Sequence, residues 1–114
     1  GEHHLRSVRE VCGYHVQARD APAGCVDDFL VDPHPWTIRY LVVDTHRWLT
    51  DRKVLIPPLW AETVDWKRKR LNLRMNRRNI ADSPLYDQRK VLSREDELAL
   101  FKHYDRRPYW KREA

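Results

Sequence analysis

Residues 24–57, GCVDDFLVDPHPWTIRYLVVDTHRWLTDRKVLIP, predict three successive β-strands joined by short polar turns. The first strand begins at Gly24 and ends where Pro33 and Pro35 fix φ and remove backbone donors. The second, residues 36–44, carries apolar side chains on both parities toward its end, which is typical of a strand that becomes buried on both faces. The third, residues 52–57, is stopped by the Pro57-Pro58 pair.

The flanking segments extend this pattern into a small barrel. Residues 14–18 alternate as another strand, and residues 59–64 form either a short helical turn or a strand bend. Residues 65–70 predict a polar hairpin tip, after which Leu71, Leu73 and Met75 point inward along a last strand. About six short strands favour a closed or nearly closed antiparallel β-barrel. Upstream, the S-x-x-E pattern at residues 7–10 predicts one helical turn.

The hydrophobic period changes after residue 76. Residues 77–82 predict a short helix, and Ser93 with Asp96 predicts the capped start of another. The apolar face of this second helix is expected to carry Leu98, Leu100, Phe101 and Tyr104. The predicted fold is therefore mainly β, with a barrel domain at residues 5–76. A C-terminal α-helical extension, residues 77–114, packs on the barrel or on a partner chain.

The strand motifs resemble one known family. The patterns G-x-V-x-D-F-L-V-D, W-x-I-R-Y-L-V-V-D-T and K-V-L-I-P, in residues 24–57, are similar to those of the PRC-barrel. This small β-barrel forms the cytoplasmic part of the photosynthetic reaction centre H subunit, and a similar barrel forms half of a ribosome-maturation factor. The S-P-x-Y-D and Y-x-R-x-P-Y-W elements, from residues 83 and 104, resemble extensions of stand-alone bacterial PRC-barrel proteins. The resemblance implies a six-stranded PRC-type barrel of the bacterial cytoplasm.

Length and composition fit one globular domain. The chain has 114 residues, and no apolar run approaches the roughly 20 residues that a membrane-spanning helix needs. The two cysteines, Cys12 and Cys25, are expected to be free and reduced, because nothing else indicates a secreted disulfide framework. Charge is uneven: residues 1–51 carry a net −3 and residues 52–114 a net +8. Such a surface steers anionic partners.

A basic run lies at and after the predicted hairpin tip. Seven cations fall within twelve residues that contain no acid: Lys67, Arg68, Lys69, Arg70, Arg74, Arg77 and Arg78. Phosphate backbones attract such patches through counterion release, and the neighbouring Trp66 offers a face on which a base can stack. The simpler interpretation is a charged turn that remains solvated and discourages edge pairing.

The C-terminal segment contains a second group of candidates. Phe101, Tyr104, Tyr109 and Trp110 form an aromatic cluster outside the barrel pattern. These side chains either fold back onto their own barrel or dock on a second copy, since aromatic residues dominate interface energetics. A homodimer through this segment is the predicted assembly, because a single-barrel chain then recovers a paired arrangement.

No residue pattern indicates catalysis. Asp27 and Asp28 are neighbours in a strand and point to opposite faces, so they do not form an acid pair. The histidines are scattered, and we find no cysteine or histidine spacing typical of a metal site. The sequence thus predicts no enzyme, metal or cofactor. It favours a non-enzymatic protein-interaction and assembly module, with a reaction-centre-like, photosynthetic role implied by the resemblance. The alternative is an RNA- or ribosome-associated factor that uses residues 67–78.

Overall fold

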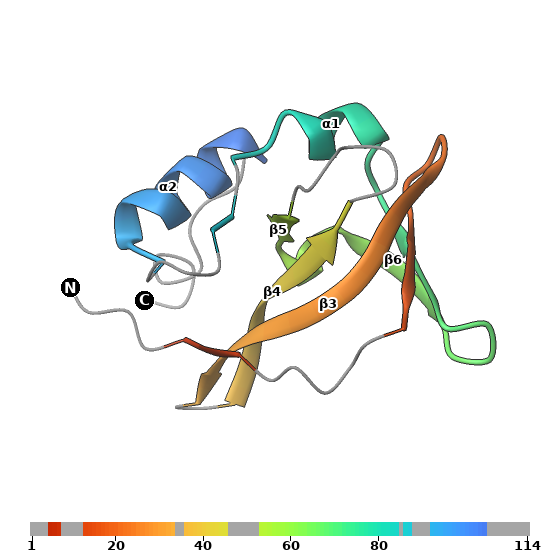
Figure 1. Cartoon of the computed structure of the whole chain (residues 1–114), viewed down its shortest axis with the longest axis horizontal. Helices are drawn as coiled ribbons and strands as arrows, with labels where there is room; N and C mark the ends of the chain where they lie inside the picture. Colours follow the sequence, from red (N-terminus) through yellow and green to blue (C-terminus); the bar gives the residue numbers. More distant parts are fainter. Residues whose placement is uncertain are drawn as a thin grey trace.

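The computed structural model describes residues 5–7, 13–33, 36–45, 53–84, 86–87 and 92–104. Within them the chain is mainly β, with two short helices after the strands (Figure 1). The longer strands are β3 (Pro22–Pro33), β4 (Trp36–Asp44) and β6 (Ala61–Asp65), and the shorter ones are β1 (Arg6–Ser7), β2 (His15–Gln17), β5 (Lys53–Ile56) and β7 (Arg70–Leu73). These bounds confirm strands where β2, β4, β5 and β7 were expected and the hairpin tip at residues 65–70, whereas β3 begins at Pro22, two residues before the expected start at Gly24, and β1 was not expected.

The strands form one mixed sheet in the order β5-β4-β3-β2-β7-β6, and β1 pairs with β3 beside this path. Most neighbours are antiparallel, but β2 and β7 run parallel, with Val16 opposite Leu71. The expectation of an entirely antiparallel sheet was therefore wrong. Local hairpins dictate antiparallel pairs, whereas β2 and β7 are brought together only by the folding of the intervening strands.

The predicted barrel closure was also wrong. Among the described residues, β5 and β6 stand at the two ends of the strand order and do not pair with each other. They are nevertheless consecutive in the chain, joined by residues 57–60, which include the short 3₁₀ turn η1 (Pro58–Trp60). Two prolines in this connection withhold backbone donors. The sheet is thus strongly curled and open, with its two ends linked by a tight corner.

Strand β3 is long and bent, and it pairs with three other strands. It pairs with β2 near Gly24, with β1 near Val31, and with β4 along most of its length. Register shifts interrupt its pairing with β4 between Val26 and Asp28 and between Leu30 and Val31. Such bulges bend a strand and increase its twist. They let one strand join two parts of a curled sheet.

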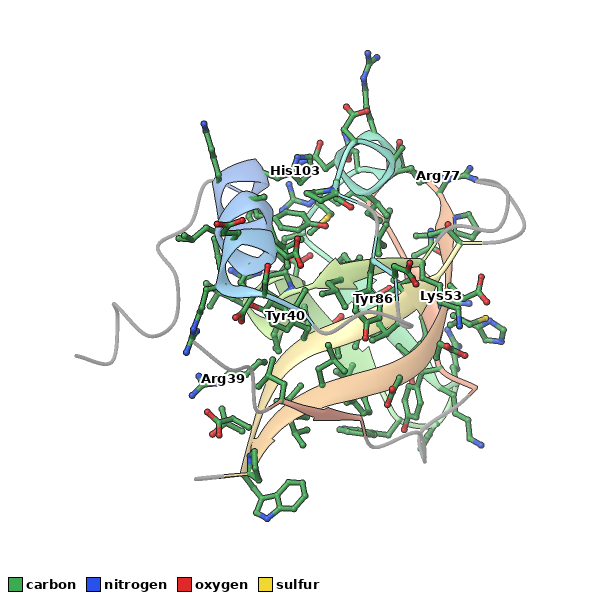
Figure 2. The ribbon with its side chains drawn as sticks, turned by 60° about the vertical axis from the view of Figure 1, so that its left-hand side comes forward. Arg39, Tyr40, Lys53, Arg77, Tyr86 and His103 are labelled. Carbon is green, nitrogen blue, oxygen red and sulfur yellow. The ribbon has the colours of Figure 1, made fainter. Side chains whose placement is uncertain are left out.

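Both helices lie on one side of the sheet (Figure 1). Helix α1 (Arg77–Ala81) buries Ile80, and helix α2 (Arg94–His103) buries Leu100 and Phe101 in the same core as the strand residues. Figure 2 shows His103 between the two helices, where its Nε2 donates a hydrogen bond of 2.6 Å to the carbonyl oxygen of Asn79. No helix in the described part of the chain is both long and apolar enough to cross a membrane.

The structure leaves one local prediction untested, confirms a second and corrects a third. Arg6 and Ser7 form strand β1, in which they pair with Val31 and Leu30, and residues 8–10, where the helical turn was expected, lie outside the described residues. The capping box of α2 is confirmed, since the Ser93 hydroxyl accepts from the backbone of Asp96 and the Asp96 carboxylate accepts from the backbone of Ser93. Leu98, expected on the apolar face, is instead 44% exposed.

Candidate functional site

The β6–β7 hairpin ends in a tight turn that projects charged side chains. Asp65 fixes this turn: its Oδ1 accepts from the backbone of Arg68 at 3.1 Å, and its Oδ2 lies 3.9 Å from Arg68 Nε. Lys69 has a φ of 50°, the left-handed conformation that non-glycine residues adopt only rarely. Its carbonyl oxygen accepts from the backbone of His15 at 2.8 Å, so the turn is attached to strand β2.

Trp66 stands on this turn and is 73% exposed. Its ring meets that of Tyr14 edge to face, with centroids 5.9 Å apart and planes at 83°. Tyr14 immediately precedes β2, and β7 lies between β2 and β6. The indole therefore leans back toward β2, away from the outer edge of β6. We call the group formed by Trp66, Lys67, Arg68, Lys69 and Arg70 the basic tip.

The seven predicted cations do not form one patch. Lys67, Arg68 and Lys69 lie on the turn, Arg70 begins β7 directly after it, and all four are exposed. Arg74 lies just beyond the far end of β7, roughly 13 Å from Arg70 at the usual rise of a strand. Arg77 and Arg78 belong to α1, which Figure 1 places away from the hairpin turn. The structure thus divides the basic run into a tip and two separate positions.

Ion pairs further distinguish these cations. Arg78 Nε lies 3.8 Å from Asp82, and the backbone of Arg77 donates to Asp20. Lys67, Lys69 and Arg70 make no ion pair with any residue that the structure describes. Their charge is available to an anionic ligand, and exposed cations of this kind attract one without a large desolvation cost.

Strand β6 forms an exposed edge of the sheet. Within the described residues it pairs only with β7, and none of its side chains is buried. Val64 of β6 and Leu59 of the preceding turn η1 are exposed apolar residues. At the other end of the strand order, Val54, Leu55 and Ile56 of β5 are buried. The two edges therefore differ, and β6 is the one available to another chain.

The C-terminal aromatic candidates divide into two pairs. Phe101 and Tyr104 are buried in their own chain, where Phe101 lies against Tyr40 and Tyr104 lies against Trp60. Burial raises the pKa of Tyr104 to about 12, although a hydrogen bond with Ser83 acts in the opposite direction. Tyr109 and Trp110 lie outside the described residues. For Phe101 and Tyr104 the structure has the folded-back arrangement; the homodimer itself stays a prediction.

A row of ionisable residues crosses the outer face of the sheet. Register pairs place His15 between Arg70 and Cys25, and they place Asp44 between Cys25 and Lys53. The free thiol of Cys25 lies 3.6 Å from Nδ1 of His15. In the described part of the chain, no three side chains of the metal-binding types gather around a common point. This row is a solvated face with one thiol–imidazole contact.

The acidic residues of β3 serve structural roles. Asp27, at the bulge, pairs with Lys53 at 2.7 Å, whereas Asp28 accepts from the backbone of Phe29. Asp32 lies 3.6 Å from the Arg39 guanidinium, and both side chains are nearly buried. The prediction that Asp27 and Asp28 do not form an acid pair is consistent with these separate partners.

Sequence reasoning missed the burial of Glu97, which belongs to α2. It is fully buried, and its carboxylate accepts from the Tyr40 hydroxyl and lies 3.4 Å from Arg94. A signal was available: positions 97, 100, 101 and 104 have the spacing of one helix face, which makes Glu97 part of the apolar stripe. In Figure 2, Tyr40 points from β4 toward α2.

Comparisons with known proteins add no family to this description. No protein-family model matches the chain, and no curated protein matches it significantly. The fold and the surfaces define a small, mainly-β domain with an open strand edge and a basic aromatic tip.

Proposed function

We propose that this chain is a non-enzymatic protein-interaction and assembly module related to the PRC-barrel, and that it joins a second copy of itself along strand β6. The observation that carries the proposal is the asymmetry of the sheet edges. No side chain of β6 is buried and its three central residues are exposed, whereas Val54, Leu55 and Ile56 of β5 are buried. An unpaired strand edge presents backbone donors and acceptors that serve as a template for another strand.

A second copy fits this edge without a charge conflict. Closed dimers use the same patch on both subunits, so two β6 strands would pair antiparallel about an axis near Thr63. The basic tips then lie at opposite ends of the paired strands, separated by about 27 Å at 3.4 Å per residue. This is well beyond the Debye length of about 8 Å at physiological salt, so their repulsion is largely screened. Pairing would also cover Val64.

The PRC-type assignment rests on the strand motifs in residues 24–57 and on the mainly-β architecture. It places the module in the bacterial cytoplasm and gives a reaction-centre-like, electron-transfer-associated role as its most specific form. A superposition of an experimental structure on the H-subunit barrel tests this assignment. A common strand order supports the relationship, and a different order contradicts it.

Light scattering tests the assembly. The expected result at micromolar concentration is a mass twice the 13.8 kDa of one chain. Val64→Lys introduces a charge at the edge and should yield monomers. The matched control is Leu98→Lys, because Leu98 is a similarly exposed apolar residue on α2. A native mass of 13.8 kDa, or equal effects of the two variants, contradicts pairing through β6.

A further inference from the structure

The basic tip contains one residue that solubility does not explain. Charged turns are common because they remain solvated, and four cations satisfy that requirement without an aromatic neighbour. Trp66 nevertheless exposes 73% of its surface beside them. Exposing an indole loses the stabilisation that burial of so large an apolar group would provide. A ligand that needs both a flat aromatic face and positive charge accounts for the combination.

We propose that the basic tip is a binding site for single-stranded nucleic acid, in which Trp66 stacks on a base and Lys67, Lys69 and Arg70 contact phosphates. This site is distinct from the β6 edge and goes beyond the assembly proposed above. Stacking is tolerant of sequence, since every base has a π-face, and phosphate contacts add affinity through counterion release. A duplex hides its base faces, so the tip selects single strands.

The local geometry supports these roles. Trp66 is held on one side by the edge-to-face contact with Tyr14, which orients the indole without covering it. The Asp65 contacts to Arg68 and the left-handed Lys69 fix the turn, so its cations are displayed on a short, ordered loop. Arg78 pairs with Asp82 on α1 and lies outside the site. The proposed site therefore contains only the cations of the basic tip and not all of those in residues 67–78.

An acidic peptide is the competing ligand, because it would also satisfy the cations. An acidic peptide does not need the indole face. Loss of the Trp66 side chain should therefore weaken the binding of a nucleic acid but not the binding of an acidic peptide. Trp36 provides a matched control: it is also 73% exposed, and it lies at the start of β4 rather than on the tip.

Fluorescence anisotropy with a labelled twelve-nucleotide uridine oligomer tests the site. We expect Trp66→Ala to weaken binding roughly ten- to a hundredfold, in line with the usual effect of losing one base–aromatic stack. Trp36→Ala should leave affinity unchanged. Equal losses in the two variants, or no loss in Trp66→Ala, overturn the proposal.

A second test measures how the affinity for the oligomer depends on the charge of the tip and on salt concentration. Lys67→Gln with Lys69→Gln removes two charges at the tip, and Arg74→Gln with Lys102→Gln removes two exposed charges elsewhere. With three phosphate contacts the logarithm of affinity should fall by about 2 per tenfold rise in salt. Only the tip double variant should reduce this slope. Equal reduction in both double variants, or equal affinity for poly-glutamate or for duplex RNA, overturns the assignment.

These outcomes are separable from those of the assembly experiment. Val64→Lys should abolish pairing and retain nucleic-acid binding, while Trp66→Ala should retain the dimer mass. Binding lost in Val64→Lys at unchanged protein concentration would contradict an independent tip site.

Discussion

The hydroxyl of Tyr40 donates a hydrogen bond of 2.6 Å to Oε1 of Glu97, and neither side chain is exposed to solvent. Tyr40 belongs to β4 and Glu97 to α2, so this bond joins the sheet to the C-terminal helix. Arg94, one turn earlier in α2, lies 3.4 Å from the other carboxylate oxygen. The interface between sheet and helix is therefore specified by a polar contact inside an apolar core.

We expect Tyr40→Phe to lower the free energy of unfolding by about 3 kcal/mol, because it removes a donor from a buried carboxylate. The double variant Tyr40→Phe, Glu97→Leu should be more stable than the single variant, since replacing both partners by apolar groups leaves no unsatisfied carboxylate. Urea denaturation of the native chain and the variants measures these differences. Additive losses in the double variant would contradict a coupled pair.

From the raised pKa of Tyr104 we predict that the protein loses stability at alkaline pH. Its pKa is about 12 in the folded chain, compared with 10.0 for an unperturbed tyrosine, so the folded state keeps its proton when the unfolded state releases it. Above pH 10 the unfolded state binds fewer protons, and the free energy of unfolding therefore decreases as pH rises. The contribution is intact below pH 10, and its loss reaches about 2 kcal/mol near pH 12.

The measurement for Tyr104 is a comparison of denaturation curves from pH 9 to 12 in the native chain and in Tyr104→Phe. The difference in stability between the two proteins isolates this group from the other residues that titrate in the same range. The difference in the free energy of unfolding between the two proteins should change with pH by the amount that the Tyr104 ionisation contributes. A constant difference across this range would show that the Tyr104 pKa is the same in the folded and unfolded states.

We predict that replacing Gly13 and replacing Gly24 by alanine lower the stability of the protein by different amounts. Gly24 has a φ of 132°, and a Cβ atom there would overlap the backbone carbonyl of Asp44. Gly13 has a φ of 111°, and a Cβ atom would meet no atom within 4 Å. Gly13→Ala should cost about 1–2 kcal/mol through backbone strain alone. Gly24→Ala adds a clash with rigid backbone and should cost about 4 kcal/mol or more.

Thermal or urea unfolding monitored by circular dichroism ranks the two glycine variants. If Gly24→Ala does not fold, Gly24→Ser should fail in the same way, because any Cβ atom meets the same carbonyl. Equal stability of Gly13→Ala and Gly24→Ala would contradict the close approach of β3 to Asp44.

Several strand ends, one buried strand face and one helix start could be predicted from the sequence, because residues next to each other in the chain decide them. The prolines at 33, 57 and 58 lie where strands end, and alternation places Leu71, Leu73 and Met75 in the core. The reciprocal hydrogen bonds of Ser93 and Asp96 begin α2. The basic tip was also visible, since its cations are consecutive and lie on a turn that the sequence marks clearly.

Other features depend on contacts between residues far apart in the chain, and only the tertiary structure decided them. The parallel pairing of β2 with β7 and the open sheet follow from how distant strands meet, which no local periodicity encodes. Helix rotation is another case: Leu98 lies about 200° around the helix from Leu100, so only one of them faces the core. Tyr40 supplies the hydrogen bond that allows Glu97 to occupy the buried face. The sequence by itself thus determined most of the elements and where they end, and the three-dimensional packing determined their pairing, the curl of the sheet and the burial of Glu97 against Tyr40.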